Sequence, residues 1–284
     1  HVAYGDKIGK FSYFIFYDRL HNDGHPQSIR SDTGSFDTGS TETAVTGPFR
    51  NENYTGSDQI IYGDNGSETA TLDLFKIKGS YDFNDNLSAR TLIAYQSRDR
   101  ERGGSNNYLQ DTNGNKIWGD NNNSTNDAQF NGEAFNVRNT NFNVEDQNRD
   151  DILIGLGFDG KFGASWEFDA AFTYFDVIDD TRNQSDENPN DPLYDKSGRI
   201  TEYYDTGWES IDLKFGNETF LSNPNLAFFT GYHFAHYSLQ TRQFNSNDYT
   251  SGNKDSFRNS SGGDTDIHGI FAQASWKFFD NWTA

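Results

Sequence analysis

The sequence predicts an all-β protein, an antiparallel transmembrane β-barrel with short turns at one end and long loops at the other. Three observations predict this fold. Apolar and polar residues alternate with period two in eight segments. The connections between these segments alternate in length, and aromatic residues gather beside the short ones. Outer-membrane barrels are built as such a meander, whereas a soluble β-sandwich is not expected to place every long loop at one end.

The eight alternating segments are predicted to be strands. In residues 151–162, Ile152, Ile154, Leu156 and Phe158 alternate with small or charged residues such as Asp159. A helical period would put charged and apolar residues on the same stripe, so we expect a strand with these four apolar side chains facing lipid. In chain order the predicted strands are 11–18, 72–82, 87–98, 151–162, 166–174, 208–216, 226–240 and 270–279.

The connections fall into two classes. Short turns are expected at 83–86, 160–165, 216–225 and 280–281. The aromatic residues beside them, which would lie in an interfacial girdle, are Phe83, Phe162, Trp166, Trp276 and Trp282. Long stretches rich in Asn, Asp, Ser and Gly cover 21–70, 101–150, 179–207 and 242–266. Because these residue types favour turns and solvent over packed elements, we expect long extracellular loops there.

The composition excludes several classes of function. The 284 residues include 23 Lys and Arg against 43 Asp and Glu, a net charge of −20, which comes close to excluding a nucleic-acid binder. The absence of cysteine excludes disulfides and thiolate zinc sites. No apolar run approaches the about 20 residues of a transmembrane helix. The chain begins at His1 and contains no Met, so we expect a processed or truncated piece.

Several runs of residues resemble those of TonB-dependent outer-membrane receptors. These runs are Gly9-Lys10-Phe11-Ser12-Tyr13-Phe14 with Tyr17-Asp18-Arg19-Leu20, Tyr81-Asp82-Phe83-Asn84-Asp85-Asn86-Leu87-Ser88-Ala89-Arg90, Gly198-Arg199-Ile200 with Gly207-Trp208, and Phe271-Ala272-Gln273 with Trp276-Lys277-Phe278 and Asn281-Trp282. The likeness extends over nearly the whole chain. It lies in the texture of strands and turns and includes no catalytic signature.

The resemblance implies a fold and indicates how much of that fold this chain contains. Receptors of this family resemble one another as a 22-stranded barrel that holds an N-terminal plug, which the periplasmic partner TonB engages. Neither the plug nor its partner-binding box is recognisable here. We therefore expect residues 1–284 to form about eight consecutive strands of the first half of such a barrel, with the plug and the C-terminal half of the barrel absent.

The resemblance also implies a function. It predicts active uptake of a scarce nutrient, a ferric siderophore or similar metal chelate, across the outer membrane of a Gram-negative bacterium. The expected partners are outer-membrane lipid and lipopolysaccharide, the nutrient itself, and TonB through the missing plug. No bond is made or broken in such transport, so we expect no enzymatic activity and no catalytic residue.

Two other functions stay open. A passive porin-like channel would have the same kind of fold. A surface β adhesin or glycan-binding module would instead stack loop aromatics on sugars. The long loops favour capture of a ligand over free diffusion. The net charge of −20 disfavours a strongly anionic substrate unless clustered arginines reverse the field locally.

One acidic run invites a calcium-site interpretation, which fails. An EF-hand loop starting at Asp111 would need Gly at its sixth position and Glu at its twelfth, where the chain has Lys116 and Asn122. Residues 111–115 are therefore predicted to form a hairpin turn within a loop. The sequence predicts no cofactor, and leaves open only loosely bound Ca²⁺ that bridges acidic loops and lipopolysaccharide phosphates.

Two further motifs are also interpreted as structural. His233 and His236 are three residues apart, and on a strand such residues point to opposite faces, so they cannot share a metal ion without a bulge. The run Asn223-Pro224-Asn225-Leu226 lies in a predicted short turn and is interpreted as turn chemistry. No metal site is predicted from either motif.

Ligand contacts are expected from polar residues that face the lumen and from aromatic residues of the loops, because Arg and aromatic groups are common anchors of recognition. Lumen salt bridges and loop packing are the structural alternative for each of these residues. The candidate ligand-binding residues are Arg90, Arg98, Arg100, Tyr108, Trp118, Tyr203 and Tyr204.

Overall fold

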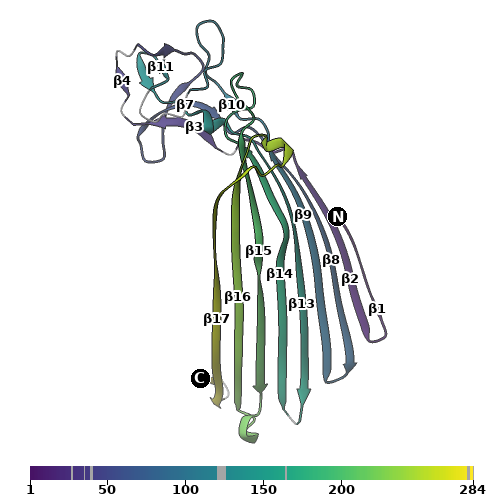
Figure 1. Ribbon diagram of the computed structural model, residues 1–284. Coiled ribbons are helices and arrows are strands. Elements are labelled where there is room, and N and C mark those ends of the chain that lie inside the picture. The colour runs from purple at the N-terminus through teal and green to yellow at the C-terminus, as the bar shows by residue number, and fades with distance from the viewer. Residues whose placement is uncertain are drawn as a thin grey trace.

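The computed structural model describes residues 1–26, 28–34, 36–38, 41–119, 126–163, 165–279 and 282–283. Its main feature is one antiparallel sheet whose strands pair in sequence order (Figure 1). The strands are β1 (Val2–Ile8), β2 (Phe11–Asn22), β8 (Glu68–Asn84), β9 (Leu87–Arg102), β13 (Glu145–Phe162), β14 (Trp166–Ser185), β15 (Gly198–Asn217), β16 (Leu226–Ser246), β17 (Ser256–Phe279) and β18 (Trp282–Thr283). All eight predicted strands are present, which confirms the all-β antiparallel fold.

The strands are longer than predicted. β14 runs to Ser185 and β15 begins at Gly198, while β16 runs to Ser246 and β17 begins at Ser256. Most of the predicted loops 179–207 and 242–266 is therefore strand, and both predictions were wrong. The backbone ladder needs no apolar side chains, and pairs such as Arg242 with Ser260 continue it beyond the apolar segment. The sequence analysis also missed β1, because Asp6 interrupts the apolar alternation of that strand.

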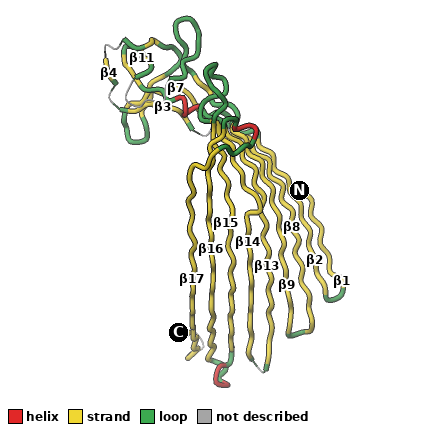
Figure 2. The backbone as a smooth tube through the Cα atoms, viewed as in Figure 1, coloured by secondary structure: helices red, strands yellow, loops and turns green. Residues whose placement is uncertain are grey.

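The short and long connections lie at opposite ends of the sheet, as predicted (Figure 2). At the short-turn end, the turn between β15 and β16 includes a 3-10 helix (Phe220–Ser222), and the side chain of Asn223 accepts a hydrogen bond of 2.9 Å from the backbone N–H of Asn225. This geometry confirms the turn interpretation of that motif. The predicted turn at 280–281 lies outside the described residues.

The sheet has two distinct faces, which the register of β13 defines. Leu156 and Phe158 lie on one face, 44% and 46% exposed. Asp159 lies on the other, where its carboxylate accepts hydrogen bonds from Ser88 (2.9 Å) and Arg90 (3.3 Å). The predicted alternation of β13 is confirmed, with Phe158 and Asp159 on opposite faces of the sheet. The face that carries Phe158 is called the apolar face below, and the face that carries Asp159 the polar face.

The ladder of the main sheet runs from β1 to β18. Within the described ranges no ladder pairs β2 with β17, a pairing that would close these strands into a small barrel. Among the described residues, no helix is long and apolar enough to cross a membrane.

Two of the predicted loops, 21–70 and 101–150, fold together into a compact unit, called the loop module below. One of its small sheets contains β3 (Ile29–Thr33), β6 (Phe49–Glu52), β7 (Asp58–Asp64) and β10 (Asn106–Asn107). The other contains β4 (Asp37–Thr38), β5 (Thr43–Ala44), β11 (Ala128–Phe130) and β12 (Glu133–Phe135). Each sheet joins strands from both segments. The buried core residues are Val45, Ile60, Tyr62, Leu109, Ala128, Phe135, Val137 and Phe142.

The loop module corrects the expectation that these stretches avoid packed elements. Their apolar residues are few and irregularly spaced, so no single stretch shows a core, and only the two together bury one. The predicted hairpin turn at 111–115 is confirmed within it. There the carboxylate of Asp111 accepts 2.8 Å hydrogen bonds from the backbone N–H groups of Asn113 and Asn115.

Candidate functional site

A group of arginines lies on the polar face where the strands approach the loop module. β9 contributes three of them, because residues two apart on a strand share a face. β13, β14 and β15 contribute one each, and the register places them close together. We call this group the arginine wall; its members are Arg98, Arg100, Arg102, Arg149, Arg182 and Arg199.

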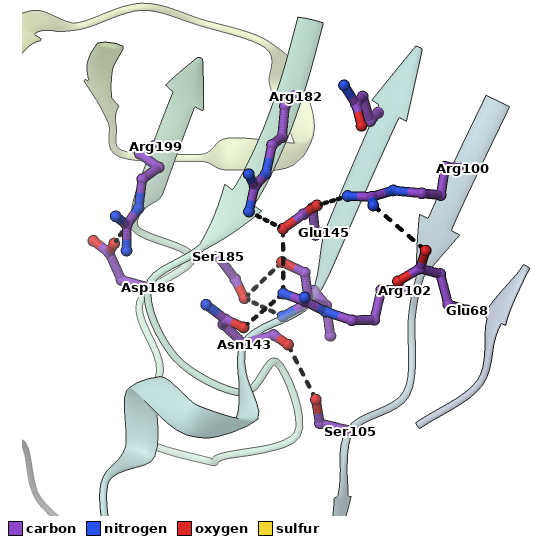
Figure 3. Close-up of polar contacts among 12 residues, drawn as sticks. Glu68, Arg100, Arg102, Ser105, Asn143, Glu145, Arg182, Ser185, Asp186 and Arg199 are labelled. Atoms are coloured by element: carbon purple, nitrogen blue, oxygen red, sulfur yellow. Dashed lines mark hydrogen bonds and ion pairs between the residues drawn. The ribbon is translucent and has the colours of Figure 1, made fainter. Parts of the chain in front are cut away.

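Glu145 lies at the centre of the arginine wall (Figure 3). Its carboxylate, on a side chain only 1% exposed, is ion-paired to Arg100, Arg182 and Arg102, the last at 3.2 Å. A buried carboxylate is costly unless it is paired and hydrogen-bonded, and three converging guanidinium groups meet that need. Arg100 also lies 3.4 Å from Glu68. The centre therefore holds more guanidinium than carboxylate.

The rest of the arginine wall is also short of acceptors. Arg98 lies directly opposite Arg149 across the β9–β13 ladder, a like-charge pair that by itself disfavours the sheet. Arg149 is paired with Asp151 at 3.2 Å and Asp180 at 3.5 Å. Among the described residues, six buried side-chain N or O atoms have no hydrogen-bond partner. Four of them are the Nε atoms of Arg98, Arg102, Arg182 and Arg199.

The local charge balance is opposite to that of the whole chain. Acidic residues outnumber basic ones 43 to 23 in the sequence. Among the described residues, five carboxylates form ion pairs with the six arginines of the wall: Glu68, Glu145, Asp151, Asp180 and Asp186. The sequence analysis disfavours an anionic ligand unless clustered arginines make the electrostatic potential locally positive. The arginine wall is such a cluster.

The loop module adds one more arginine beside the wall. Burial lowers the pKa of Arg30 on β3, and the nearby charge of Arg102 lowers it further. Like the wall arginines, Arg30 has a buried Nε without a hydrogen-bond partner in the described part of the chain. A guanidinium has five N–H donors and no acceptor, so this end of the polar face offers donors in excess.

The structure brings only some of the predicted ligand residues together. Arg98 and Arg100 belong to the arginine wall, whereas Arg90 lies on the same face near the short-turn end of β9, paired with Asp159 and Asp169. The sequence analysis missed Glu145 and the other four wall arginines. The alternation at 98, 100 and 102 was visible in the sequence, but the contributions of β13, β14 and β15 depend on register.

Three of the predicted aromatic residues, Tyr108, Trp118 and Tyr204, contact side chains outside the arginine wall. Tyr108 belongs to the loop module, where it stacks on Phe49 and its hydroxyl donates a hydrogen bond to Asp64. This hydrogen bond is the largest cause that raises the pKa of Tyr108 to about 12. The structure thus gives Tyr108 a structural partner.

Two of the remaining aromatic candidates, Trp118 and Tyr204, also have packing partners. Trp118 packs edge-on against the core residue Phe142, with ring centroids 5.7 Å apart. The guanidinium of Arg242 lies 4.7 Å from the ring centroid of Tyr204, and Tyr203 is its neighbour on β15. The predicted set therefore does not form one site.

The two predicted histidines follow the alternation. His233 Nδ1 lies 2.6 Å from Oδ1 of Asp212, and His236 Nδ1 lies 2.7 Å from Oδ1 of Asp266. The register puts the first pair on the polar face and the second on the apolar face, so the two rings cannot meet at one ion. Among the described residues no group of three or more His, Cys, Asp or Glu could hold a metal ion.

Comparison with known proteins gives a distant structural likeness. No family model matches the chain, and no curated protein matches it. Among solved structures, it is similar to the ferric yersiniabactin uptake receptor FyuA from Yersinia pestis, with 10% sequence identity and a TM-score of 0.46. The likeness covers 96% of this chain and 36% of that receptor, so the chain spans about a third of its length. At this level it establishes neither a shared family nor a shared ligand.

Proposed function

We propose that this chain forms part of the wall of an outer-membrane uptake receptor of the TonB-dependent type. In this proposal the loop end faces outward and captures a scarce nutrient, a ferric siderophore or similar metal chelate. Transport is energised from the periplasmic side, and the protein makes or breaks no covalent bond in its ligand.

The apolar face supports a membrane location. Its apolar band extends from Ile152 to Phe162 on β13, and bands of similar length occur on β9, β14, β16 and β17. Each matches the about 9–11 residues of a tilted transmembrane strand. Exposed aromatic residues border it at the short-turn end, including Phe162 and Trp276, 48% and 54% exposed. Contact of such an apolar surface with lipid is favourable, whereas its contact with water is not.

The slope of this band is the observation that carries the proposal. One cross-strand row on the apolar face reads Ile15, Ile77, Ile93, Ile154, Tyr174, Glu209, His236 and Asp266. The row is apolar on β2 to β13 and becomes charged by β15. An apolar band that runs obliquely across the rows is expected when strands tilt against a membrane, as they do in barrels.

The polar face and the loop module support capture of a ligand. The arginine wall lies at the loop end, and the folded loops stand beside it. Arginines also line passive anion channels, so the wall by itself supports an anionic solute and not one mode of transport. The folded loops at this end favour capture of a ligand over free diffusion.

The proposal is tested in a strain that lacks the protein containing this chain. The deletion strain and a complemented strain are grown on a panel of ferric chelates, cobalamin, copper complexes and glycans. We expect loss of uptake of one nutrient, and loss of the same uptake in complemented cells treated with a protonophore. Uptake that survives the protonophore would indicate a porin-like channel. Glycan binding by a protein that is absent from the outer-membrane fraction would indicate an adhesin.

A further inference from the structure

We propose that the arginine wall binds anionic groups of the transported solute, carboxylates or phosphates, and that Glu145 competes with them from within the protein. This inference rests on the proposed uptake function, and it adds the chemical class of the ligand. Its basis is the excess of guanidinium donors over carboxylate acceptors at the arginine wall, in an otherwise strongly acidic protein.

The geometry suits a ligand with two or more anionic groups. Arg100, Arg149 and Arg182 have side chains 27–32% exposed, so their guanidinium groups are partly open to the polar face. They come from three neighbouring strands, β9, β13 and β14. Arginine pairs with carboxylate or phosphate through charge-assisted and often bidentate hydrogen bonds. A polyanionic solute could therefore contact two strands at once.

The position of Glu145 gives the proposal a distinctive prediction. Its charge is buried beneath the guanidinium groups and lowers the positive potential that an outside anion meets. Replacing Glu145 with Gln should raise that potential and tighten the binding of an anion, whereas replacing a wall arginine should weaken it. A wall with a purely structural role would not move anion affinity in opposite directions.

The test uses the full-length protein that contains this chain, purified in detergent. Binding is measured by calorimetry with citrate as a carboxylate probe, pyrophosphate as a phosphate probe and uncharged trimethyl citrate. Variants Arg182→Gln and Arg98→Gln should weaken binding of the preferred anion about tenfold or more, as expected for loss of one charged hydrogen bond. Glu145→Gln should tighten it severalfold, and higher salt should weaken it in every variant.

The matched control is Lys214→Gln, which removes one positive charge from the polar face of β15 towards its short-turn end. It should change the affinity less than twofold. Thermal melting of each variant shows which ones are folded, and only folded variants are compared. Affinity unchanged in folded Arg182→Gln and Arg98→Gln, equal binding of trimethyl citrate, or weaker binding in folded Glu145→Gln would overturn the inference.

The result is separable from that of the proposed function. Energised uptake that does not depend on Arg98, Arg182 or the charge of the solute would leave the receptor proposal in place and reject the anion site. Anion binding that responds to the variants as expected, in a protein without energised uptake, would do the opposite.

Discussion

At the scale of single residues, this protein places ionisable groups beside partners that hold them in one state. Tyr108 is the clearest case in the loop module. Its hydroxyl donates a hydrogen bond to the carboxylate of Asp64, and ionisation of the phenol would both remove that donor and set two negative charges side by side. This is why its pKa rises to about 12, above the usual value of 10.

The raised pKa of Tyr108 predicts a specific dependence on alkaline pH. The hydrogen bond stabilises the folded protein fully below the unfolded pKa of about 10, and this contribution is lost as pH rises through the folded pKa of about 12. The stability difference between wild type and Tyr108→Phe should therefore shrink over this range, as measured by denaturant titration. In a titration followed by phenolate absorbance, Tyr108→Phe should show one fewer tyrosine ionising near pH 12 than wild type.

Asp64→Asn provides the control for this prediction. Without the neighbouring charge, the phenol of Tyr108 should titrate closer to the ordinary value for tyrosine. An absorbance titration of Tyr108→Phe identical to that of wild type above about pH 11 would contradict the assignment.

At the scale of elements, β13 has one apolar and one polar set of side chains, and substitutions in the two sets should differ in energy. Ile154 lies near the middle of β13, within its apolar band. Its neighbour Gly155 lies on the polar face, where an added Cβ would meet only the Cβ of Leu92, at an ordinary 3.5 Å. The two positions are adjacent in sequence but face different surroundings.

An arginine at each of these positions should therefore have a different effect. Ile154→Arg should destabilise the protein folded in lipid by about 2–4 kcal/mol, the usual cost of a charge near the middle of a barrel's lipid face. Gly155→Arg should cost clearly less. Urea titration of the full-length protein in lipid vesicles measures both. Equal losses would contradict a lipid-facing Ile154.

At the scale of the whole molecule, the loop module has a buried core of its own beside the main sheet. Phe135 on β12 is fully buried and stacks on Tyr62 of β7, with ring centroids 6.1 Å apart. The core thus joins the segments 21–70 and 101–150, which are separated in the sequence by the long strands β8 and β9. Loss of one core residue should loosen both segments together.

Phe135→Ala tests this coupling. A buried Phe replaced by Ala typically costs about 3–5 kcal/mol, enough to open a small unit locally. Hydrogen exchange should become faster in β7 as well as in β11 and β12, while the strands of the main sheet keep their protection. Tyr54→Ala, at a fully exposed side chain elsewhere in the loop module, is the control. Faster exchange confined to residues 126–137 would show that the two segments fold independently.

The sequence by itself determined the main strands, their faces and the end at which the loops gather. Period two is written in consecutive residues, so a run such as Ile152 to Phe158 specifies both strand and facing without reference to the rest of the chain. Tertiary structure alone decided the arginine wall and the loop module. Arg100 meets Glu145 across 45 positions of sequence, and such pairs exist only once the register of neighbouring strands is set. Irregularly spaced residues such as Tyr62 and Phe135 become a core only when two distant segments close on each other, because neither segment can exclude water alone.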